Sequence, residues 1–334
     1  MANIIVTGGA GFIGSHLVSE LIKNQHKVTV IDDLSTGKRQ NLPDNVNFIH
    51  ASLENIESGI FKGIDIVYHL ASIAGESVSL FAPDACYKRN VISGYNVLMH
   101  SLKFGVRRIV FSSSMAVYGN KRKAPFKEKH IPNPTDPYGL SKYEMEKLLD
   151  IYGGHTGLEW VSLRLHNVYG PRINLNDPYR GVVGIFINLL LHEKAPVLYG
   201  GDNHVRAFTY IDDVIPYLVQ SGFEDKYNEK ILNIGSDEKT KLVNLAYLLI
   251  KMTDFRGEPI FYPERPGEKA IAYSSHSQAK SLLGFSAKTP LRYGLEKTLD
   301  WAKKQQIPEF NYSLMRTEFE LENIMPKTWK EKLL

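Results

Sequence analysis

A glycine-rich segment near the N-terminus limits the possible folds of this chain more than any other feature. The segment TGGAGFIG, residues 7–14, directly follows the strand-like run NIIVT and opens an amphipathic stretch of helix length. Glycines at this spacing between a strand and a helix are typical of a turn that binds a dinucleotide pyrophosphate. Gly8 permits the tight turn, Gly11 lets the backbone approach the phosphates, and Gly14 lets helix and strand pack closely. The helix N-terminus offers free N–H groups to the anion.

The rest of the first half alternates short β-branched runs with amphipathic stretches, as parallel strands joined by crossover helices do. We expect strands at NIIVT, KVTVID, VNFIH, DIVYHL, RRIVFSS and EWVSLR. We expect helices at Phe12–Asn24, Ala85–Phe104 and Tyr138–Gly153. The pattern predicts an α/β protein with a Rossmann-type doubly wound parallel sheet and a smaller, interleaved C-terminal α/β substrate lobe.

The second predicted strand ends in Asp32, about twenty residues after the glycine-rich turn. A carboxylate at that place accepts both hydroxyls of the adenosine ribose and repels a 2′-phosphate, so Asp32 predicts NAD rather than NADP. Lys38 and Arg39 follow in the next loop and either weaken this preference or remain solvated.

Beyond about Arg164 the rhythm changes, because prolines, glycines and aromatic residues crowd the chain as far as Tyr210. We expect residues 1–165 to form the NAD-binding Rossmann domain and residues 166–334 to form mainly the substrate lobe. Segments near residues 207–235 are expected to return to the Rossmann core.

Composition excludes several other classes of protein. The apolar run of residues 181–191 is far shorter than the roughly 20 residues that span a bilayer, and no basic lead-in precedes the first strand, which predicts a cytoplasmic location. Cys86 is the single cysteine, so neither an intramolecular disulfide nor a thiol metal cluster is expected, and we predict no metal site. A net charge of +4 is too even for nucleic-acid binding by charge alone.

A serine-rich strand end and a tyrosine–lysine pair form the candidate catalytic unit. The run RRIVFSS leads into Ser114, and the helix that follows Pro137 carries Tyr138 and Lys142, four residues apart on one helical face. The same spacing recurs elsewhere, at Tyr143/Lys147, Tyr247/Lys251 and Tyr293/Lys297. Position therefore decides, and it favours Tyr138 because this residue follows the serine strand and opens its helix. Tyr143 lies about 140° further around that helix, so both pairs cannot face one cleft.

The pair has a plausible electrostatic role. A tyrosine with a pKa near 10 is a poor base at neutral pH, and lowering its pKa to about 7 requires about 4 kcal/mol. An ammonium about 4 Å away supplies about 4 kcal/mol at an effective dielectric near 20. We therefore expect Lys142 to hold Tyr138 as a phenolate beside an oxidised nicotinamide, with Ser114 donating to the same substrate oxygen. The alternative is a helix-surface pair without a catalytic role.

In the order and spacing of its motifs the chain resembles the extended short-chain dehydrogenase/reductase family, most closely the UDP-glucose (galactose) 4-epimerases. The segments that carry the resemblance are TGGAGFIGSHL, VIDDLSTG, YHLAS, RNVISGYNVL, FSSSMAVYG, YGLSK, LRLHNVYGPR, RAFTYIDDV, LNIGS and RPGEK. The resemblance implies an NAD-dependent enzyme that oxidises C4 of a nucleotide-diphosphate sugar to a ketone, lets the sugar turn over, and reduces it on the opposite face, with Tyr138 as acid and base.

The resemblance also assigns site residues. Ser114, Tyr138 and Lys142 match the catalytic residues. Cofactor contacts are implied for Gly8, Gly11, Phe12, Ile13, Gly14, Asp32, Asp33, Thr36, Gly37, Leu53, Leu70, Ala71, Ser72, Asn90, Ser112, Tyr138, Lys142 and His166. Substrate contacts are implied for Ser114, Asn167, Tyr199, Arg206, Arg265 and Glu268. Arg206 and Arg265 can clamp a diphosphate through forked hydrogen bonds, or can instead form ion pairs that join the lobes.

Departures from the family pattern limit the assignment of the substrate. Ser52 replaces a usual aspartate near the adenine, Ser72 a small apolar residue and His166 an aromatic residue beside the nicotinamide, so a sugar other than glucose or galactose stays an open alternative for the pocket. Met115 and Ala116 stand where dehydratases carry an Asp-Glu pair and neither moves a proton, which disfavours dehydration, and the glutamate of the decarboxylases is likewise missing.

Several alternatives stay open. The stretch NVYGPRINLNDPYRGVVGIF also resembles dTDP-sugar 4-epimerases, so the nucleotide base is either uracil or thymine. A reductase of nucleotide-linked 4-keto sugars is the main enzymatic rival, and an NAD-sensing protein without chemistry is the non-enzymatic one. The resemblance further implies a homodimer that pairs through the helices at residues 85–104 and 138–153.

Overall fold

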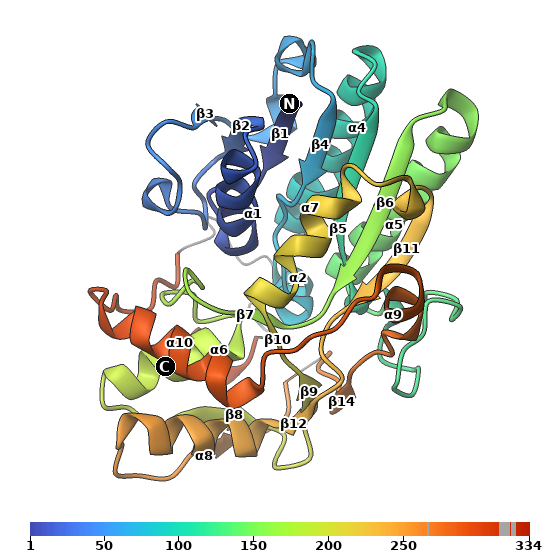
Figure 1. Ribbon diagram of the computed structural model, residues 1–334. Helices are drawn as coiled ribbons and strands as arrows, with labels where there is room; N and C mark the ends of the chain where they lie inside the picture. The colour runs from blue at the N-terminus through green and yellow to red at the C-terminus, as the bar shows by residue number, and fades with distance from the viewer. Residues whose placement is uncertain (266, 314–320, 322–324) are drawn as a thin grey trace.

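A parallel β-sheet forms the centre of the larger half of the molecule (Figure 1). The computed structural model describes residues 1–265, 267–313, 321 and 325–334, and within them seven parallel strands stand in the order β11-β6-β5-β4-β1-β2-β3. The strands are β1 (Asn3–Thr7), β2 (Lys27–Asp32), β3 (Asn47–His50), β4 (Ile66–His69), β5 (Arg108–Ser114), β6 (Glu159–Leu165) and β11 (Lys230–Ile234). The six strands expected from the sequence and the doubly wound fold class are confirmed.

The strand order reverses between β1 and β4. From β1 the chain moves outward through β2 and β3, and it then returns to β4 and moves the other way through β5 and β6. In open α/β sheets the carboxyl ends of the strands form a crevice at such a switch point, and ligands bind there. The glycine-rich turn follows β1, and Ser114 ends β5, so both candidate motifs lie at this edge of the sheet.

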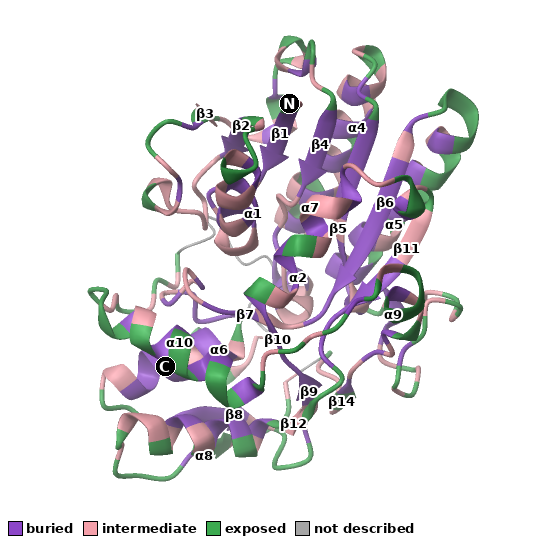
Figure 2. Ribbon diagram, in the orientation of Figure 1, coloured by how far each residue is buried: buried purple, intermediate pink, exposed green. Residues whose placement is uncertain are grey.

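Helices cover both faces of the sheet because each strand is apolar on both sides. On β1, Ile4 and Val6 belong to the core cluster that includes α1 (Phe12–Lys23) and α7 (Ile215–Ser221), whereas Ile5 faces the cluster of α4 (Ser93–Lys103) and α5 (Pro137–Thr156). Figure 2 shows these strands as the buried centre of the molecule. The predicted helix at residues 85–104 is divided into α3 (Pro83–Cys86), a π-helical turn (Tyr87–Ile92) and α4.

A smaller lobe of helices and short strands lies at the lower side of Figure 1. Its helices are α6 (Val182–Leu191), α8 (Leu242–Thr253) and α10 (Leu291–Lys303), while α9 (Ser277–Leu283) packs against β11 of the main sheet. Its strands are β7 (Val168–Tyr169), β8 (Val197–Tyr199), β9 (Val205–Ala207), β10 (Thr209–Tyr210), β12 (Lys239–Lys241), β13 (Ile260–Tyr262) and β14 (Ile271–Ala272). One apolar cluster runs from Ile4 in β1 to Leu245 in α8 and Leu295 in α10, so the two halves share a core. The boundary at residue 165 stays a prediction.

The end of the chain packs back onto the larger half. The short helix α11 (Lys327–Lys330) buries Trp329 against Phe81 of α2 (Glu76–Phe81) and against Tyr179, with ring centroids 5.6 and 5.0 Å apart. The C-terminal Leu334 belongs to the same apolar cluster. Among the described residues, no helix has both the length and the apolar character needed to cross a membrane.

Candidate active site

The glycine-rich turn has no room for side chains at two positions. Gly8 has φ +68°, and a Cβ atom there would lie 2.7 Å from the backbone nitrogen of Ala71. At Gly14 a Cβ atom would lie 2.2 Å from the carbonyl oxygen of Gly8. Because α1 begins at Phe12, its first N–H groups point into the turn without intrahelical acceptors. The turn therefore forms a bare, partly positive cradle that fits a pyrophosphate.

Asp32 fastens this turn to the end of β2. Its buried carboxylate accepts hydrogen bonds of 2.9 Å from the backbone N–H groups of Ala10 and Leu34. Burial raises its pKa, while these two hydrogen bonds act in the opposite direction. The carboxylate lies in the wall of a cavity whose predicted cofactor residues are Gly8, Asp32, Asp33, Leu53, Ala71 and Ser72. The contact of Asp32 with a ribose stays a prediction.

The remaining predicted cofactor residues lie around the same edge. Phe12, Ile13 and Leu70 pack, partly buried, against the core, and Thr36 lines a hollow next to Phe12. Gly37 lies against Ala10, where a Cβ atom would be 3.0 Å from a carboxylate oxygen of Asp32. Ser52 caps a short 3-10 turn by accepting from Glu54 N at 3.3 Å.

Asn90, inside the π-helical turn, ties two segments together. Its amide group hydrogen-bonds both backbone polar groups of Ile73, at 2.8 and 3.0 Å, and donates to the Ser141 hydroxyl at 3.1 Å. The loop after β4 is thereby fixed to α5, the helix that carries Tyr138.

Local sequence explains why Tyr138 stands where it does. The Asp136 carboxylate caps α5 by accepting from Gly139 N at 2.8 Å, and Pro137 occupies the first helical position. Tyr138 and Lys142 are 9% and 3% exposed, so they are not a helix-surface pair. The Lys142 Nζ atom lies 5.7 Å from the Tyr138 ring centroid and donates to the Ser112 carbonyl at 2.8 Å. By contrast, Lys147 of the Tyr143/Lys147 pair is exposed and bonded to Asp150.

The electrostatics of this pair differ from the expectation. The pKa of Tyr138 is raised to about 12, chiefly by burial and in part by the charge of Glu76. Hydrogen bonding to Ser114 opposes this rise. Burial also lowers the pKa of Lys142 to about 7, against the influence of Cys86 and Glu146. Burial therefore opposes the phenolate, and the prediction that Lys142 holds Tyr138 ionised beside an oxidised nicotinamide stays a prediction. The burial that gathers the two groups disfavours the charged form of each, which the helical spacing does not reveal.

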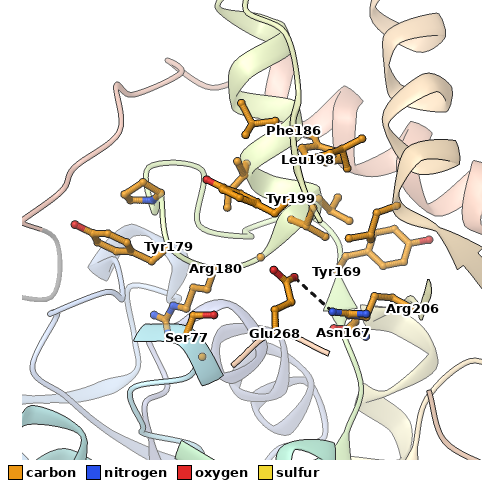
Figure 3. A pocket seen from close by; sticks show the side chains of 18 of the residues that line it. Ser77, Asn167, Tyr169, Tyr179, Arg180, Phe186, Leu198, Tyr199, Arg206 and Glu268 are labelled. Carbon is orange, nitrogen blue, oxygen red and sulfur yellow. Dashed lines mark hydrogen bonds and ion pairs between the residues drawn. The ribbon is translucent and has the colours of Figure 1, made fainter. Parts of the chain in front are cut away.

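The predicted substrate residues converge on one cavity. Its wall includes all five residues assigned beyond Ser114, namely Asn167, Tyr199, Arg206, Arg265 and Glu268 (Figure 3). Glu268 receives hydrogen bonds from Arg265 at 2.8 and 3.0 Å and from Arg206 at 3.5 Å. Although burial acts to raise the pKa of Glu268, these guanidinium groups hold it below its ordinary value. All three charged residues lie in the C-terminal half, so these ion pairs do not join the two lobes. Because one carboxylate lies between two guanidinium groups, the cluster of Arg206, Arg265 and Glu268 keeps a net positive charge.

His166 is placed differently from the expected contact. The side chain is fully buried and packs edge-on against His276, with ring centroids 5.2 Å apart, rather than lining the substrate cavity. Neither ring nitrogen has a hydrogen-bond partner among the described residues, and burial lowers its pKa well below the ordinary value. His166 is therefore neutral and acts in packing here, while its contact with a nicotinamide stays a prediction.

Sequence reasoning missed several residues of the cavity. Glu76 and Arg180 line it, and Arg180 donates to the Asp177 carboxylate at 2.7 Å and to the Ala74 carbonyl at 3.1 Å. Arg180 lies in a loop and Glu76 in a short helix, and neither segment has a periodic pattern. Their charge within otherwise apolar segments was the only sequence signal that indicated them.

The C-terminal segment completes the cavity wall. Leu334 lines it, and the hydroxyl groups of Thr328 and Tyr199 hydrogen-bond at 2.5 Å. The Arg265 guanidinium lies 4.3 Å from the ring centroid of Tyr199 and 5.4 Å from that of Trp329. Nothing in the local sequence of this segment indicated a role at the cavity.

Comparison with known proteins agrees with this geometry. The model of the NAD dependent epimerase/dehydratase family matches residues 4–235. One similar structure is the UDP-glucose 4-epimerase of Thermotoga maritima with UDP-glucose, at 35% identity over 90% of this chain and 99% of that chain, with a TM-score of 0.84. Another is the UDP-glucuronic acid 4-epimerase of Bacillus cereus with UDP-glucuronic acid and NAD, at 31% identity over 90% of this chain and 99% of that chain, with a TM-score of 0.83. UDP-glucuronic acid decarboxylase 1 of Xenopus tropicalis is 31% identical over 310 residues, which cover 90% of this chain and 72% of that protein.

Proposed function

This chain belongs to the NAD-dependent epimerase/dehydratase family, and we propose that it inverts C4 of a nucleotide-diphosphate hexose, with UDP as the nucleotide. The observation that carries the proposal is the arrangement around one cavity. Tyr138, Ser114 and Lys142 lie together at the sheet edge, and Glu76, whose charge acts on Tyr138, lines the cavity that has Arg206 and Arg265 in its wall. Such a site can bind a diphosphate at one place and exchange a proton with a sugar hydroxyl at another.

The residues after Ser114 support epimerisation over the family's other reactions. Met115 packs against the apolar cluster of Val117 and Phe126, and Ala116 is buried next to Tyr138. Neither side chain transfers a proton, so the site lacks there the acid and base that elimination of water requires, and the glutamate expected of a decarboxylase is absent from this strand end.

The chain's own residues supply proton transfer and positioning. When bound, NAD takes up a hydride from the sugar, returns it, and adds the positive charge that Lys142 alone does not provide to the phenol. Tyr138 accepts the proton of the C4 hydroxyl while Ser114 hydrogen-bonds the same oxygen. Arg206 and Arg265 hold the diphosphate by forked hydrogen bonds, so that the resulting 4-keto sugar stays bound while its ring turns. Tyr138 then returns the proton after reduction on the opposite face.

A direct assay tests the proposal. The NAD-loaded protein is incubated with UDP-glucose, UDP-galactose and the corresponding dTDP-, GDP- and CDP-sugars, and inversion at C4 is scored by NMR. We expect inversion of a UDP-hexose without added reductant. Product formation only with stoichiometric consumption of NADH would show a 4-keto reductase instead, and preferential turnover of dTDP-sugars would correct the nucleotide.

We also propose that the protein is a homodimer paired through α4 and α5. Four large apolar side chains on the π-helical turn, α4 and α5 are exposed, namely Tyr87, Tyr95, Leu140 and Ile151, at 55, 45, 55 and 50%. Sedimentation at micromolar concentration should give a dimer, and Leu140→Glu should shift it to monomer. A wild-type monomer under these conditions would contradict the proposal.

A further inference from the structure

Glu76 places a carboxyl group in the substrate cavity without a partner. It is the first residue of α2, directly after Gly75, and it lines the cavity together with Arg180 and Arg206. Its carboxyl group makes no hydrogen bond or ion pair with any residue that the structure describes. Glu268, which lines the same cavity, is held by two guanidinium groups. The two carboxyl groups therefore differ in kind, because Glu268 is satisfied within the protein and Glu76 is left for a ligand.

One hydroxyl group fixes Glu76 beside Tyr138. The Ser79 hydroxyl donates to the backbone carbonyl of Glu76 at 2.7 Å and accepts from the backbone N–H of Tyr138 at 3.0 Å. The two backbones therefore lie within two hydrogen-bond lengths of each other, and Ser79 itself is fully buried. The Glu76 backbone cannot move away from the backbone of the acid/base tyrosine without breaking this link.

The electrostatic surroundings place Glu76 between the two working ends of the site. The pKa of Glu76 is raised to about 7, chiefly by burial and then by the charge of Asp136. Glu268 acts in the same direction, whereas the positive charges of Arg206 and Lys269 lower this pKa. After burial itself, Glu76 is in turn one of the groups that raise the pKa of Tyr138. In the proposed complex, a hexose whose C1 carries the diphosphate at Arg206 and whose C4 meets Tyr138 would extend along the cavity wall that contains Glu76.

Arg180, which lines the same cavity, is already engaged by other groups of the protein. Arg180, which Figure 3 shows beside Ser77, donates its Nε–H to the Asp177 carboxylate at 2.7 Å and a terminal N–H to the Ala74 carbonyl. The ion pair of Arg180 and Asp177 is neutral as a unit, whereas the Glu76 carboxyl group accepts no hydrogen bond from a described residue. A ligand group that donates hydrogen bonds satisfies it, and a second carboxylate meets like charge.

We propose that Glu76 selects the sugar, by accepting a hydrogen bond from a hydroxyl or amino group of the hexose and by disfavouring a hexuronate. The inference rests on the proposed function, because it assumes a nucleotide-linked sugar in this cavity. The proposal distinguishes enzymes for neutral sugars from enzymes for acidic sugars, because relatives named for UDP-glucuronic acid must accommodate a carboxylate at their sugar site.

Equilibrium binding tests the assignment without requiring turnover. The NAD-loaded wild type, Glu76→Gln and the control Glu57→Gln, which removes an exposed carboxylate, are titrated with UDP, UDP-glucose and UDP-glucuronic acid by calorimetry at pH 8, where Glu76 is ionised. We expect the wild type and the control to bind UDP-glucose about tenfold more tightly than UDP-glucuronic acid. In Glu76→Gln this ratio should fall about fivefold, through tighter binding of UDP-glucuronic acid, with UDP binding unchanged.

The outcomes separate the two proposals. If the wild type binds UDP but does not discriminate between the sugars, or if Glu76→Gln keeps the wild-type ratio, the assignment of Glu76 is overturned and the proposed function stands. If the wild type binds neither UDP nor a UDP-sugar, the proposed function falls and the assignment falls with it. Loss of UDP binding in Glu76→Gln alone would indicate a folding defect, and the same ratio is then measured on Glu76→Ala, where an unchanged value again overturns the assignment.

Discussion

The glycine-rich turn at the cofactor end is built from neighbouring segments of the chain, whereas the substrate cavity is assembled from segments that are far apart. Gly8, Gly14 and Asp32 belong to two consecutive strands and the helix between them. The wall of the substrate cavity takes Glu76 from the larger half, Arg206 from the smaller lobe and Leu334 from the chain end. A local motif thus creates the first site, and the second exists only in the folded molecule.

The two ends also satisfy their charges differently. Asp32 is held by backbone N–H groups, which substitution of side chains does not alter. Glu268 is held by the side chains of Arg206 and Arg265, and Glu76 by no described group. Single substitutions can therefore retune the substrate end while the cofactor end stays intact, and the predictions below test this separation.

Tyr138→Phe should have the largest effect and should affect neither end as a binding site. Loss of a positioned acid/base group lowers kcat by about 10²–10⁴. The ring stays buried and its hydroxyl is the only group removed, so binding of NAD and UDP-sugar should change little. Stopped-assay NMR gives kcat and calorimetry gives both affinities. Tyr143→Phe, on the other side of α5, serves as control, and an equal loss there would contradict the assignment of Tyr138.

Arg206→Gln should damage the substrate end alone. Hydrogen bonds to charged groups contribute about 1.5–3 kcal/mol, which corresponds to UDP-sugar binding weakened by about 10- to 100-fold. NAD binding should stay within about twofold of wild type because Arg206 lies in β9, away from the glycine-rich turn. Calorimetry measures both, with the exposed Arg292→Gln as control. A parallel loss of NAD affinity would show that the two ends are not separable.

Lys142→Met should lower turnover and stabilise the protein. Burial lowers the Lys142 pKa to about 7, so the unfolded chain binds the proton more tightly than the folded one, and the folded state is destabilised most below pH 7. The lowering corresponds to about 4–5 kcal/mol, from which loss of the hydrogen bond to the Ser112 carbonyl subtracts, leaving about 1–3 kcal/mol of stabilisation at pH 6.

The pH dependence gives this prediction its sign. As pH rises from 7 towards 10.5 the unfolded chain loses its extra proton, and the advantage of Lys142→Met should shrink. Urea unfolding at pH 6 and pH 9 measures the difference. Lys147→Met, on the exposed side of the same helix, should show no such gain. A destabilised Lys142→Met at pH 6 would show that the hydrogen bond to Ser112 outweighs the cost of burying the amine.

The sheet was predictable because its signals are local. Val67 and Ile109 are fully buried in runs of β-branched residues, and such runs between turn residues indicate strands covered on both faces. The glycine-rich turn was predictable for the same reason, since its glycines stand at their characteristic spacing within a short stretch of chain between a strand and a helix. The π-helical turn at Tyr87–Ile92 was not, because its sequence continues the helical pattern on both sides.

The substrate cavity was only partly predictable. Arg206, Arg265 and Glu268 could be assigned by resemblance, yet their sharing of one carboxylate depends on how two loops of the smaller lobe meet. The pKa values of Tyr138 and Lys142 depend on burial, which the helical spacing does not encode. The contact of the C-terminal segment with the cavity depends on packing between segments distant in the chain.

Thr328→Val should have the smallest effect. It changes the substrate cavity from α11, the helix closest to the C-terminus. The substitution keeps the buried volume but removes the 2.5 Å hydrogen bond to the Tyr199 hydroxyl, next to which Arg265 lies. Loss of one such bond, about 0.5–1.5 kcal/mol, should raise KM for the UDP-sugar by about 2- to 12-fold, with kcat and NAD affinity unchanged. A double-mutant cycle with Tyr199→Phe isolates the contact, because the two changes should be non-additive if the hydroxyl groups act as a pair. Strict additivity would mean that the chain end merely covers the cavity.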